Sequence, residues 1–485
     1  MDPRFKIVYP NQYDEVEQRV IDEIRRFMPE DPEKIMGLLD RQMAGETFYP
    51  GLELNSAFRP SEYTIGTQEL NASASKINPY NPIYNDIAYA KKTTWGRVLS
   101  VPLSVPVAAG FPYLPKETDA WVWVNDDQVD DCIGGLDHVM TFYKPIGAGD
   151  TVRTVVTKQY FEDVTDPNGS ECRTFRIVGE GDLYNQNDEK VAHLYHSVTE
   201  RFHVFSDPKY AADFKGTTPH HSAVRRYRDW NKARPWHNYT DEDWNTIKTI
   251  WENEYIRGAD TLYWEDVNIG DEPAPTADGP FPDDMPMMPP MNTKVTVRDA
   301  LTKDPAELFK GPPGMPVMPG MGGTVELGKD EHGIITVTVK QNMPGGPGGP
   351  SGPAGQKKHP NERSSFQNTD GRDYCARVIT NWMGDEGFLH QFAWRLTSDI
   401  DHNKFPENYD RPSYLFKVPY LREQGKFMTT HGFAGDVSIN RAYVCDKYIK
   451  DGKHYVELVV WGEVMNGQIY TECYAVVELP SRDNP

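Results

Sequence analysis

The chain of 485 residues carries 51 basic and 72 acidic side chains, which gives a formal net charge of −21. A surface this acidic repels the phosphate backbone of nucleic acids and anionic membrane surfaces, so we expect no nucleic-acid or membrane partner. The length allows two to four domains, each with a core of its own.

The five cysteines indicate a reducing compartment. They are odd in number, widely spaced and never in a CxxC pair, which argues against a disulfide framework and against a zinc site. The N-terminus has no apolar core of signal-peptide length, and no stretch reaches the roughly 20 apolar residues of a membrane span. We therefore expect a soluble, cytoplasmic protein without a bound metal.

An amphipathic helix is predicted to open the chain, within an N-terminal cap over residues 1–45. Apolar residues recur there at helical spacing, at Val16, Val20, Ile21, Ile24 and Phe27. From about residue 121 the pattern changes to short alternating runs bounded by Gly, Asp and Asn, which is typical of an antiparallel sheet. These runs cover residues 120–125, 151–161, 172–181 and 191–202.

A second helix is predicted within a linker over residues 208–260. Thr240 and Asp243 have the spacing of a capping box, and apolar residues follow at helical spacing, at Trp244, Ile247, Ile250 and Trp251. This helix divides the chain into two parts.

The tract over about residues 273–355 is rich in Pro, Gly and Met and reads as an insertion. It lacks a sustained period, so we expect residues 273–323 to supply no core strand and no long helix, and to wrap the surface or an oligomer contact. Beyond it, one face of a helix is predicted at Tyr374, Val378, Ile379 and Trp382, with Gly384 just past its end. Strand patterns follow over residues 436–449, 453–464 and 468–479.

The two parts of the chain match each other in order. "GLDHVMTF" at 135–142 aligns with "GFLHQFAW" at 387–394 at an offset of 252, and "GAGDTV" at 147–152 aligns with "GFAGDV" at 432–437. Matches in the same order with drifting offsets predict a duplicated domain with loop insertions.

Four segments carry a resemblance to a known family: "NPIYNDIAYAKKTTWG", "YKPIGAGDTV", "RGADTLYWEDVNIGDE" and "ITNWMGDEGFL". Together with the repeat of helix and antiparallel sheet, they resemble the MaoC-like acyl dehydratases, which are double hot-dog proteins of the R-specific enoyl-CoA hydratase kind. The resemblance implies an α+β fold with two curved antiparallel sheets, each wrapped around a long helix. The first half would be residues 46–207 and the second half residues 261–485.

In that family, a backbone N–H at the start of each long helix faces the thioester carbonyl, where negative charge develops during hydration. The matching glycines here are Gly96 and Gly371. The alternative is that each glycine only permits the turn into its helix. The resemblance thus places a candidate oxyanion donor at each helix start.

The family's acid/base pair is an Asp and a His five positions later, which exchange protons with water and the α-carbon. The first half has Pro79 and Tyr84 at these positions, and the second half has Ala354 and His359. Only His359 matches. The resemblance therefore implies that the second half is catalytic and that the first half is degenerate and accommodates the acyl chain.

Other residues are candidates for the same site. Asp370 could replace the missing partner of His359, although with Asp373 it also has the pattern of a helix N-cap. Tyr84 could donate a proton across a shared tunnel, or could simply pack. The expected substrate-binding residues are Asn81, Asp86, Gly96, Arg225 and Arg226, the two arginines being placed for CoA phosphates.

Asp385 and His390 also have the Asp-to-His spacing of a hydratase pair. The repeat instead places His390 on a strand and Asp385 in the exit turn of the preceding helix. We keep them only as a fallback catalytic pair.

The predicted function is reversible water addition to an enoyl-CoA, which is a carbon–oxygen lyase reaction without a cofactor other than the CoA of the substrate. One alternative is a non-catalytic acyl-CoA-binding or scaffold subunit that pairs with an active homologue. Another is a hot-dog acyl-CoA thioesterase. A homodimer or higher homo-oligomer is expected by resemblance.

Overall fold

The fold is taken from a computed structural model that describes residues 3–27, 63–64, 78–103, 129–210, 235–281, 296–303, 308, 323–341, 368–397, 413–428 and 432–483. Arg225, Arg226, Ala354 and His359 lie outside these ranges. Within these ranges no helix is long and apolar enough to cross a membrane.

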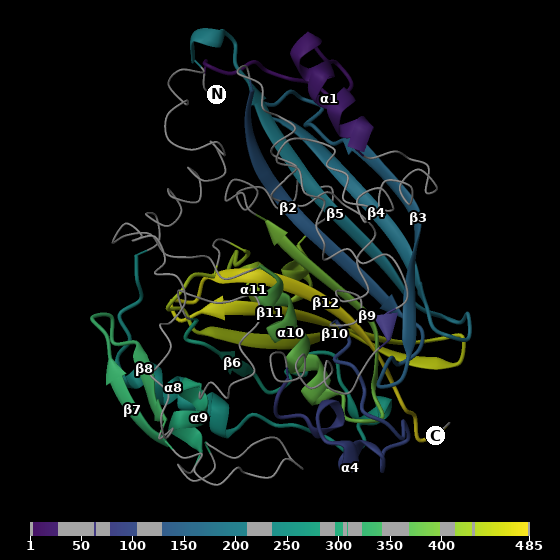
Figure 1. Ribbon diagram of the computed structural model, residues 1–485, viewed down its shortest axis with the longest axis vertical. Helices are drawn as coiled ribbons and strands as arrows, with labels where there is room; N and C mark the ends of the chain where they lie inside the picture. The colour runs from purple at the N-terminus through teal and green to yellow at the C-terminus, as the bar shows by residue number, and fades with distance from the viewer. Residues whose placement is uncertain are drawn as a thin grey trace.

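One ten-stranded antiparallel sheet forms the centre of the molecule (Figure 1). Its strands, from one edge to the other, are β1 (Tyr63–Thr64), β3 (Thr151–Asp163), β4 (Arg173–Tyr184), β5 (Lys190–Val204), β2 (Val129–Phe142), β9 (Phe388–Thr397), β12 (Ile469–Leu479), β11 (Lys453–Val464), β10 (Ser438–Lys450) and β6 (Thr276–Asp278). The two predicted antiparallel sheets are thus present as the two halves of one sheet. The half-sheets join edge to edge where β2 pairs with β9, and this pairing leaves neither half with an exposed edge there.

The strand order is the same when read outward from the centre in either direction. The first half runs β2-β5-β4-β3-β1, and the second half runs β9-β12-β11-β10-β6. When the strands of each half are numbered along the chain, both halves have the order second, fifth, fourth, third, first from the centre outward. This identical order is what a duplicated unit would give.

Matching turns precede β3 and β10. In the first, the Gly147 N–H donates to Asp150 Oδ2 at 3.0 Å; in the second, the Phe433 N–H donates to Asp436 Oδ2 at 2.7 Å. The residue before each aspartate is a glycine with positive φ, at Gly149 and Gly435. The sequence match between these segments is thus also a match in local structure.

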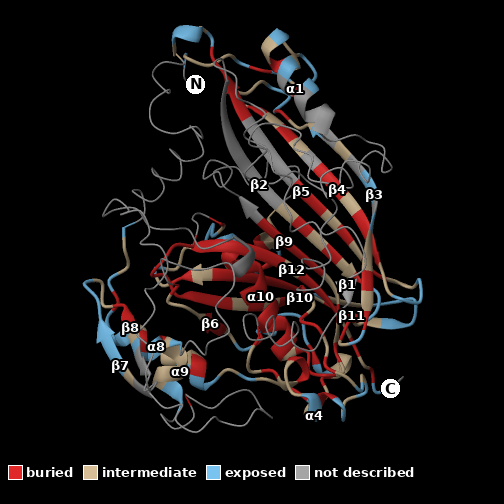
Figure 2. Cartoon of the chain, viewed as in Figure 1, coloured by how far each residue is buried: buried red, intermediate tan, exposed pale blue. Residues whose placement is uncertain are grey.

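The long helix α10 (Asn368–Trp382) occurs in the second half, where it packs on β9, β10, β11 and β12. Buried residues concentrate in this helix and these strands (Figure 2). In the first half, residues 78–103 contain only η1 (Pro82–Tyr84) and the four-residue α4 (Ile87–Ala90) as helices. A long helix starting at Gly96 is therefore not found in the described residues.

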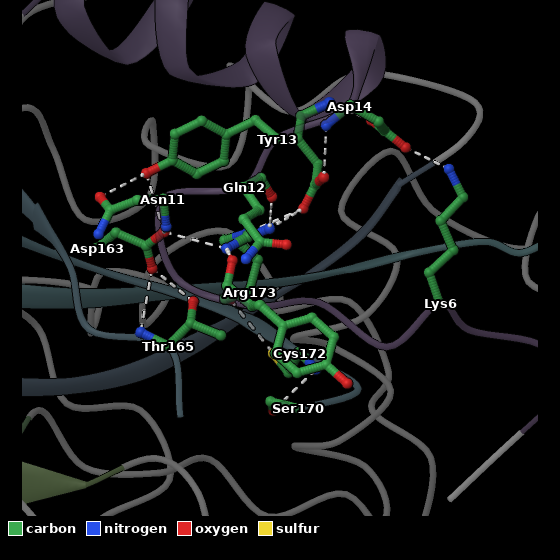
Figure 3. Close-up of polar contacts among 12 residues, drawn as sticks. Lys6, Asn11, Gln12, Tyr13, Asp14, Asp163, Thr165, Ser170, Cys172 and Arg173 are labelled. Atoms are coloured by element: carbon green, nitrogen blue, oxygen red, sulfur yellow. Dashed lines mark hydrogen bonds and ion pairs between the residues drawn. The ribbon is translucent and has the colours of Figure 1, made fainter. Parts of the chain in front are cut away.

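The N-terminal helix is α1 (Glu15–Phe27), as its apolar period predicts, and Ile21 is fully buried. Arg173 of β4 attaches the N-terminal segment to the sheet (Figure 3). Its guanidinium binds Glu17 at 2.6 Å and Asp163 at 3.0 Å, and it also donates to the carbonyls of Tyr9 and Gln12. Because Arg173 is fully buried, this network is the polar anchor of the N-terminal segment.

The linker helix is α8 (Asp241–Glu252), and its predicted capping box between Thr240 and Asp243 is present. Its buried face contacts the hairpin of β7 (Gly323–Lys329) and β8 (Ile335–Gln341) through a separate apolar cluster that includes Trp244 and Ile335. The short helix α9 (Val297–Thr302) lies against both α8 and β8.

The insertion contributes more structure than expected. Its first segment supplies β6, which pairs with β10 at the edge of the main sheet and buries Thr276 and Ala277. The prediction that residues 273–323 contain no core strand is wrong here. Prolines flank this three-residue strand, and an edge strand tolerates them because one side of it needs no ladder partner.

The remaining short elements connect the larger ones. They are η3 (Pro208–Tyr210), η4 (Trp264–Asp266), η7 (Tyr414–Lys417) and α11 (Pro419–Glu423).

Candidate active site

The first turn of α10 is the part of the described structure that fits the predicted site best. Gly371 is the fourth residue of this helix. The fourth residues of α8 and α9, Trp244 and Ala300, donate to the carbonyl just before their helices, so the N–H groups without a carbonyl partner in the first turn of α10 belong to the residues before Gly371. The helix dipole adds positive potential at the same end. An unpartnered N–H in this turn can donate to a developing oxyanion.

Gly371 also has a packing role. A Cβ placed there would lie 2.7 Å from the Tyr470 ring and 3.2 Å from Thr471 Cγ2, both on β12. Only glycine lets the start of α10 approach the sheet this closely. Packing therefore accounts for the glycine by itself, and the donor role remains a prediction.

A buried ion pair follows Gly371 in the same turn. Arg372 donates from Nε and Nη2 to Asp373 Oδ1 at 2.9 and 2.8 Å, and both side chains are buried. Asp373 thus adds negative charge near the positive end of the helix, where it is favourable. The predicted partner Asp370 lies one residue before Gly371 on the helix backbone, but its side chain lies outside the described residues.

Two histidines of the first half lie beside this turn. His138 of β2 and His196 of β5 are directly opposite in the strand register, and their rings meet edge to face at a centroid distance of 4.1 Å. Arg372 Nη1 lies 3.5 Å from His138 Nδ1. Burial and the nearby Arg372 charge lower the pKa of His196 to about 3, and burial is also the largest cause that lowers the pKa of His138.

The pairing of these two histidines is not apparent from the sequence, because nothing in it brings His196 opposite His138. The available signal was alternation: His138 shares a face with Met140, and His196 shares a face with Leu194, both of which are buried core residues. Two histidines on apolar strand faces were the only indication.

Residues 78–96, which include the family-like segment at residues 81–96, fold against the C-terminal end of α10. Asn78 Nδ2 donates to Thr380 Oγ1 at 3.0 Å and to Asn381 Oδ1 at 2.9 Å. Asn81 caps η1 by accepting from the Ile83 N–H, and its Nδ2 donates to the Thr380 carbonyl at 3.3 Å. Asn81 thus has a structural role at this end of the helix.

Asp86 and Gly96 also have local structural explanations. The Asp86 carboxylate caps α4 by accepting from the N–H groups of Ala88 and Tyr89. Gly96 lies in an exposed turn with φ of +65°, and its N–H donates to the Thr93 carbonyl. The prediction that Gly96 starts a helix and offers a free N–H is therefore wrong, because a left-handed glycine ends this turn instead.

Tyr84 is fully buried near the end of α10. Burial is the largest cause that raises the pKa of its hydroxyl, and the neighbouring Asp385 charge raises it further. Tyr84 packs with Ile83 and Val101. Thr380, its hydrogen-bonding neighbour, lies nine residues beyond Gly371, which is about 14 Å along a helix. Tyr84 and Gly371 therefore do not converge on one thioester carbonyl.

The fallback pair is not brought together. Asp385 lies in the turn beyond α10, where its carboxylate accepts from Tyr89 Oη at 2.6 Å and its carbonyl accepts from Trp95 Nε1 at 2.7 Å. His390 lies on β9 as predicted, and its Nδ1 is 3.0 Å from the Phe142 carbonyl. Each residue has partners that explain it without catalysis.

A cleft opens between Trp95 of the first half and the start of β9 in the second half. Its outer part, of about 380 Å³, is lined by both halves, including Trp95, Tyr143, Phe388 and Lys453. A smaller cavity of about 40 Å³ shares Trp95 and Phe388 and continues inward to Tyr84 and Met383, among other residues. This cleft lies at the exit end of α10, away from Gly371.

Comparison with known proteins gives a family match for part of the chain. Residues 55–194 match the FAS1-like, dehydratase domain region. The match confirms the resemblance to the MaoC-like dehydratases that was predicted from the sequence. A comparison with curated proteins gives no match.

Several solved structures are similar to the chain. A MaoC-like dehydratase has 13% identity and a TM-score of 0.39, with 87% of this chain and 97% of that chain covered. A MaoC-like dehydratase from Phytophthora capsici has 10% identity and a TM-score of 0.33, with 88% and 98% covered. A Mycobacterium tuberculosis protein with a double hotdog fold has 10% identity and a TM-score of 0.34, with 86% and 93% covered.

Proposed function

We propose that this protein catalyses the reversible addition of water to an enoyl-CoA thioester at the first turn of α10. The observation that carries the proposal is the position of Gly371 in that turn, packed against β12 at the start of the longest helix that the structure describes. The dehydratase match over residues 55–194 supports the reaction class.

In the proposed reaction, an unpartnered N–H in the first turn of α10, which Gly371 allows to lie against β12, stabilises the enolate oxygen that forms when water adds to the β-carbon of the enoyl thioester. His359 exchanges a proton with the substrate as general acid/base. Its place in the sequence, 12 residues before Gly371, is the basis of this assignment. The reaction needs no cofactor beyond the CoA of the substrate.

The acyl group and the CoA moiety would be held by other parts of the chain. Arg225 and Arg226 are proposed to bind the CoA phosphates, because they form a local basic segment in an acidic protein. The first half is proposed to accommodate the acyl chain, and the protein is proposed to act as a homo-oligomer in the cytoplasm.

A non-catalytic acyl-CoA-binding or scaffold subunit is the second candidate. The observation that favours it is that Asn81, Tyr84 and Asp86 of the family-like segment are engaged in caps and packing. A thioesterase, the third candidate considered from the sequence, is distinguished by the same experiment.

The experiment is to incubate the purified full chain with crotonyl-CoA and to follow both the loss of the conjugated double bond and the release of free thiol. Loss of the double bond without thiol release supports the hydratase. Thiol release indicates the thioesterase. Binding of crotonyl-CoA by calorimetry without either change indicates the scaffold, and absence of binding contradicts every acyl-CoA function.

A further inference from the structure

The cleft at the C-terminal end of α10 is a cavity that the proposed reaction does not use. Its outer part, of about 380 Å³, is lined by Trp95 and Tyr143 of the first half and by Phe388 and residues 452–454 of the second half. Protein clefts that hold small molecules have volumes of roughly 300–1,000 Å³. The cleft is therefore large enough for a small-molecule ligand.

One wall of the cleft is held in place by contacts between the two halves. Trp95 Nε1 donates to the Asp385 carbonyl at 2.7 Å, and Thr94 Oγ1 lies 3.2 Å from each carboxylate oxygen of Glu386. Tyr89 Oη donates to Asp385 Oδ2 at 2.6 Å. A ligand that enters the cleft thus meets a wall that is already ordered, which lowers the entropy cost of binding.

The inner end of the cleft is mostly apolar. Trp95 and Phe388 line both the outer part and the inner cavity. The inner cavity is also lined by the apolar residues Phe142, Ile146, Met383 and Leu389. Aromatic rings hold apolar groups, and their faces also attract organic cations.

The two lysines that line the cleft are already paired. Lys453 Nζ lies 2.8 Å from Glu478 Oε2, and Glu478 also lines the outer part. Lys144, which lines the inner cavity, forms an ion pair with Glu189. Neither lysine is therefore left to neutralise an anionic ligand, so the cleft does not suit the phosphates of CoA.

Glu386 is the lining carboxylate that has no cation beside it. It forms no ion pair with any residue that the structure describes, and its carboxylate accepts only from the neutral Thr94 hydroxyl. The remaining titratable side chain of this wall, His454, packs its ring on Trp264 with the centroids 5.3 Å apart. The charge of the cleft is thus complementary to a cation.

We propose that the cleft binds a small organic cation, in which an ammonium group is carried on an apolar or aromatic chain. The ammonium donates to Glu386, and the apolar part lies against Trp95 and Phe388 toward the inner cavity. This site is separate from the first turn of α10, and the inference does not depend on the proposed hydratase function.

The first test compares three probes of similar size and different charge. Calorimetry of the full chain at pH 7 measures the binding of phenethylammonium, 3-phenylpropan-1-ol and 3-phenylpropanoate. We expect phenethylammonium to bind with a dissociation constant between about 10⁻⁵ and 10⁻³ M, about tenfold more tightly than the neutral alcohol, with the anion weakest. Equal affinities, a preference for the anion, or no binding of phenethylammonium would overturn the inference.

The second test removes the charge of Glu386. The variant Glu386→Gln should weaken phenethylammonium binding about tenfold and leave binding of the alcohol unchanged. Glu331→Gln is the matched control, because it changes the net charge equally at a side chain that is 88% exposed and lies outside the cleft. The same loss in both variants would show a general charge effect and would contradict a site at Glu386.

A third measurement needs no variant. Indole NMR signals of the ¹⁵N-tryptophan-labelled wild-type protein are followed while phenethylammonium is added. The Trp95 signal should shift, and the signal of Trp251, whose Nε1 donates to the buried Ala277 carbonyl, should stay. An unchanged Trp95 signal at saturation would place the bound cation elsewhere and overturn the inference.

The separation of the two sites is tested with butyryl-CoA, a thioester that has no double bond to hydrate. Saturating butyryl-CoA should leave the affinity for phenethylammonium unchanged. Competition between them would make the cleft part of the thioester site and would overturn the inference. Lack of crotonyl-CoA hydration contradicts only the proposed function, because the binding of the cation is measured without turnover.

Discussion

Met140 of β2 and Phe392 of β9 lie directly opposite each other where the two half-sheets join, and they are also separated by the repeat offset of 252 residues. A residue that pairs with its own repeat equivalent marks the position of a local twofold axis. Both side chains are fully buried. The duplicated halves thus meet at equivalent positions of equivalent strands, as two copies of a symmetric dimer would.

The symmetry of the sheet is not matched by the helices. The second half covers its strands with α10, whereas residues 78–103 of the first half form short helices and turns around Gly96. This difference agrees with a division of labour in which one half holds the thioester at a helix start. It also makes the two candidate glycines testable against each other.

Gly371→Ala and Gly96→Ala should have different effects. A methyl group at Gly371 would meet the Tyr470 ring at 2.7 Å, so we expect an unfolding free energy lower by about 1–3 kcal/mol and reduced hydratase activity. At Gly96 the methyl group meets nothing within 4 Å, and the cost is the left-handed φ alone, of the order of 1 kcal/mol. Urea denaturation and a crotonyl-CoA assay check both variants. Equal activity losses would contradict the assignment of the site to Gly371.

Tyr84→Phe should leave turnover unchanged. Tyr84 is buried beside Thr380, at the end of α10 far from Gly371, so loss of its hydroxyl removes a hydrogen bond rather than a catalytic group. We expect kcat within about twofold of wild type and a stability loss of about 1 kcal/mol. A fall in kcat comparable to that of a general-base variant would restore Tyr84 as a proton donor.

Arg173→Met should release the N-terminal segment. Arg173 is fully buried and binds both Glu17 and Asp163, so its removal leaves two buried carboxylates without their cation. Breaking such a pair costs about 3–5 kcal/mol. We expect faster amide hydrogen exchange in residues 15–27 than in β10. The variant Arg176→Met on the same strand is the control, because Arg176 pairs with a half-exposed Glu162. Equal exchange in both variants would show that Arg173 is not the anchor.

Acid should destabilise the protein through the histidine pair. Burial lowers the folded-state pKa of His138 and His196 below the unfolded value of about 6.5, so the unfolded state binds protons that the folded state excludes as pH falls below 6.5. Between pH 7 and pH 5.5 each histidine should cost about 1 kcal/mol. The double variant His138→Asn/His196→Asn should therefore have a flatter pH dependence of the urea midpoint. The same slope in variant and wild type would contradict neutral burial.

The sequence predicted the elements whose signals are local. Helical period and capping residues located α1, α8 and α10, and alternation located β3, β4, β5 and the C-terminal strands. Gly96 was misread because a glycine that starts a helix and one that closes a turn with positive φ look the same in a sequence. The edge strand β6 is not apparent from the sequence because a strand of only three residues carries no period.

The histidine pair could not be predicted for a different reason. His138 and His196 meet through the register of β2 with β5, and both approach Arg372 only because the two halves share one sheet. These are contacts between residues 58 and 234 positions apart, counted from their numbers in the sequence. A single sequence gives no means of fixing such a register beyond apolar alternation.

His359→Ala decides whether the chemistry lies where the sequence predicts. If His359 exchanges the proton while the first turn of α10 holds the enolate charge, loss of the His359 imidazole should lower kcat by about 10² or more and leave KM nearly unchanged, because a general acid/base acts in the transition state. His454→Ala is the control, since His454 lies on β11 and lines the cleft at the other end of α10. Binding of butyryl-CoA, measured by calorimetry, should be the same in both variants and in wild type. If turnover is unaffected while binding persists, the His359 assignment is wrong, and Asp385 and His390 become the next residues to substitute.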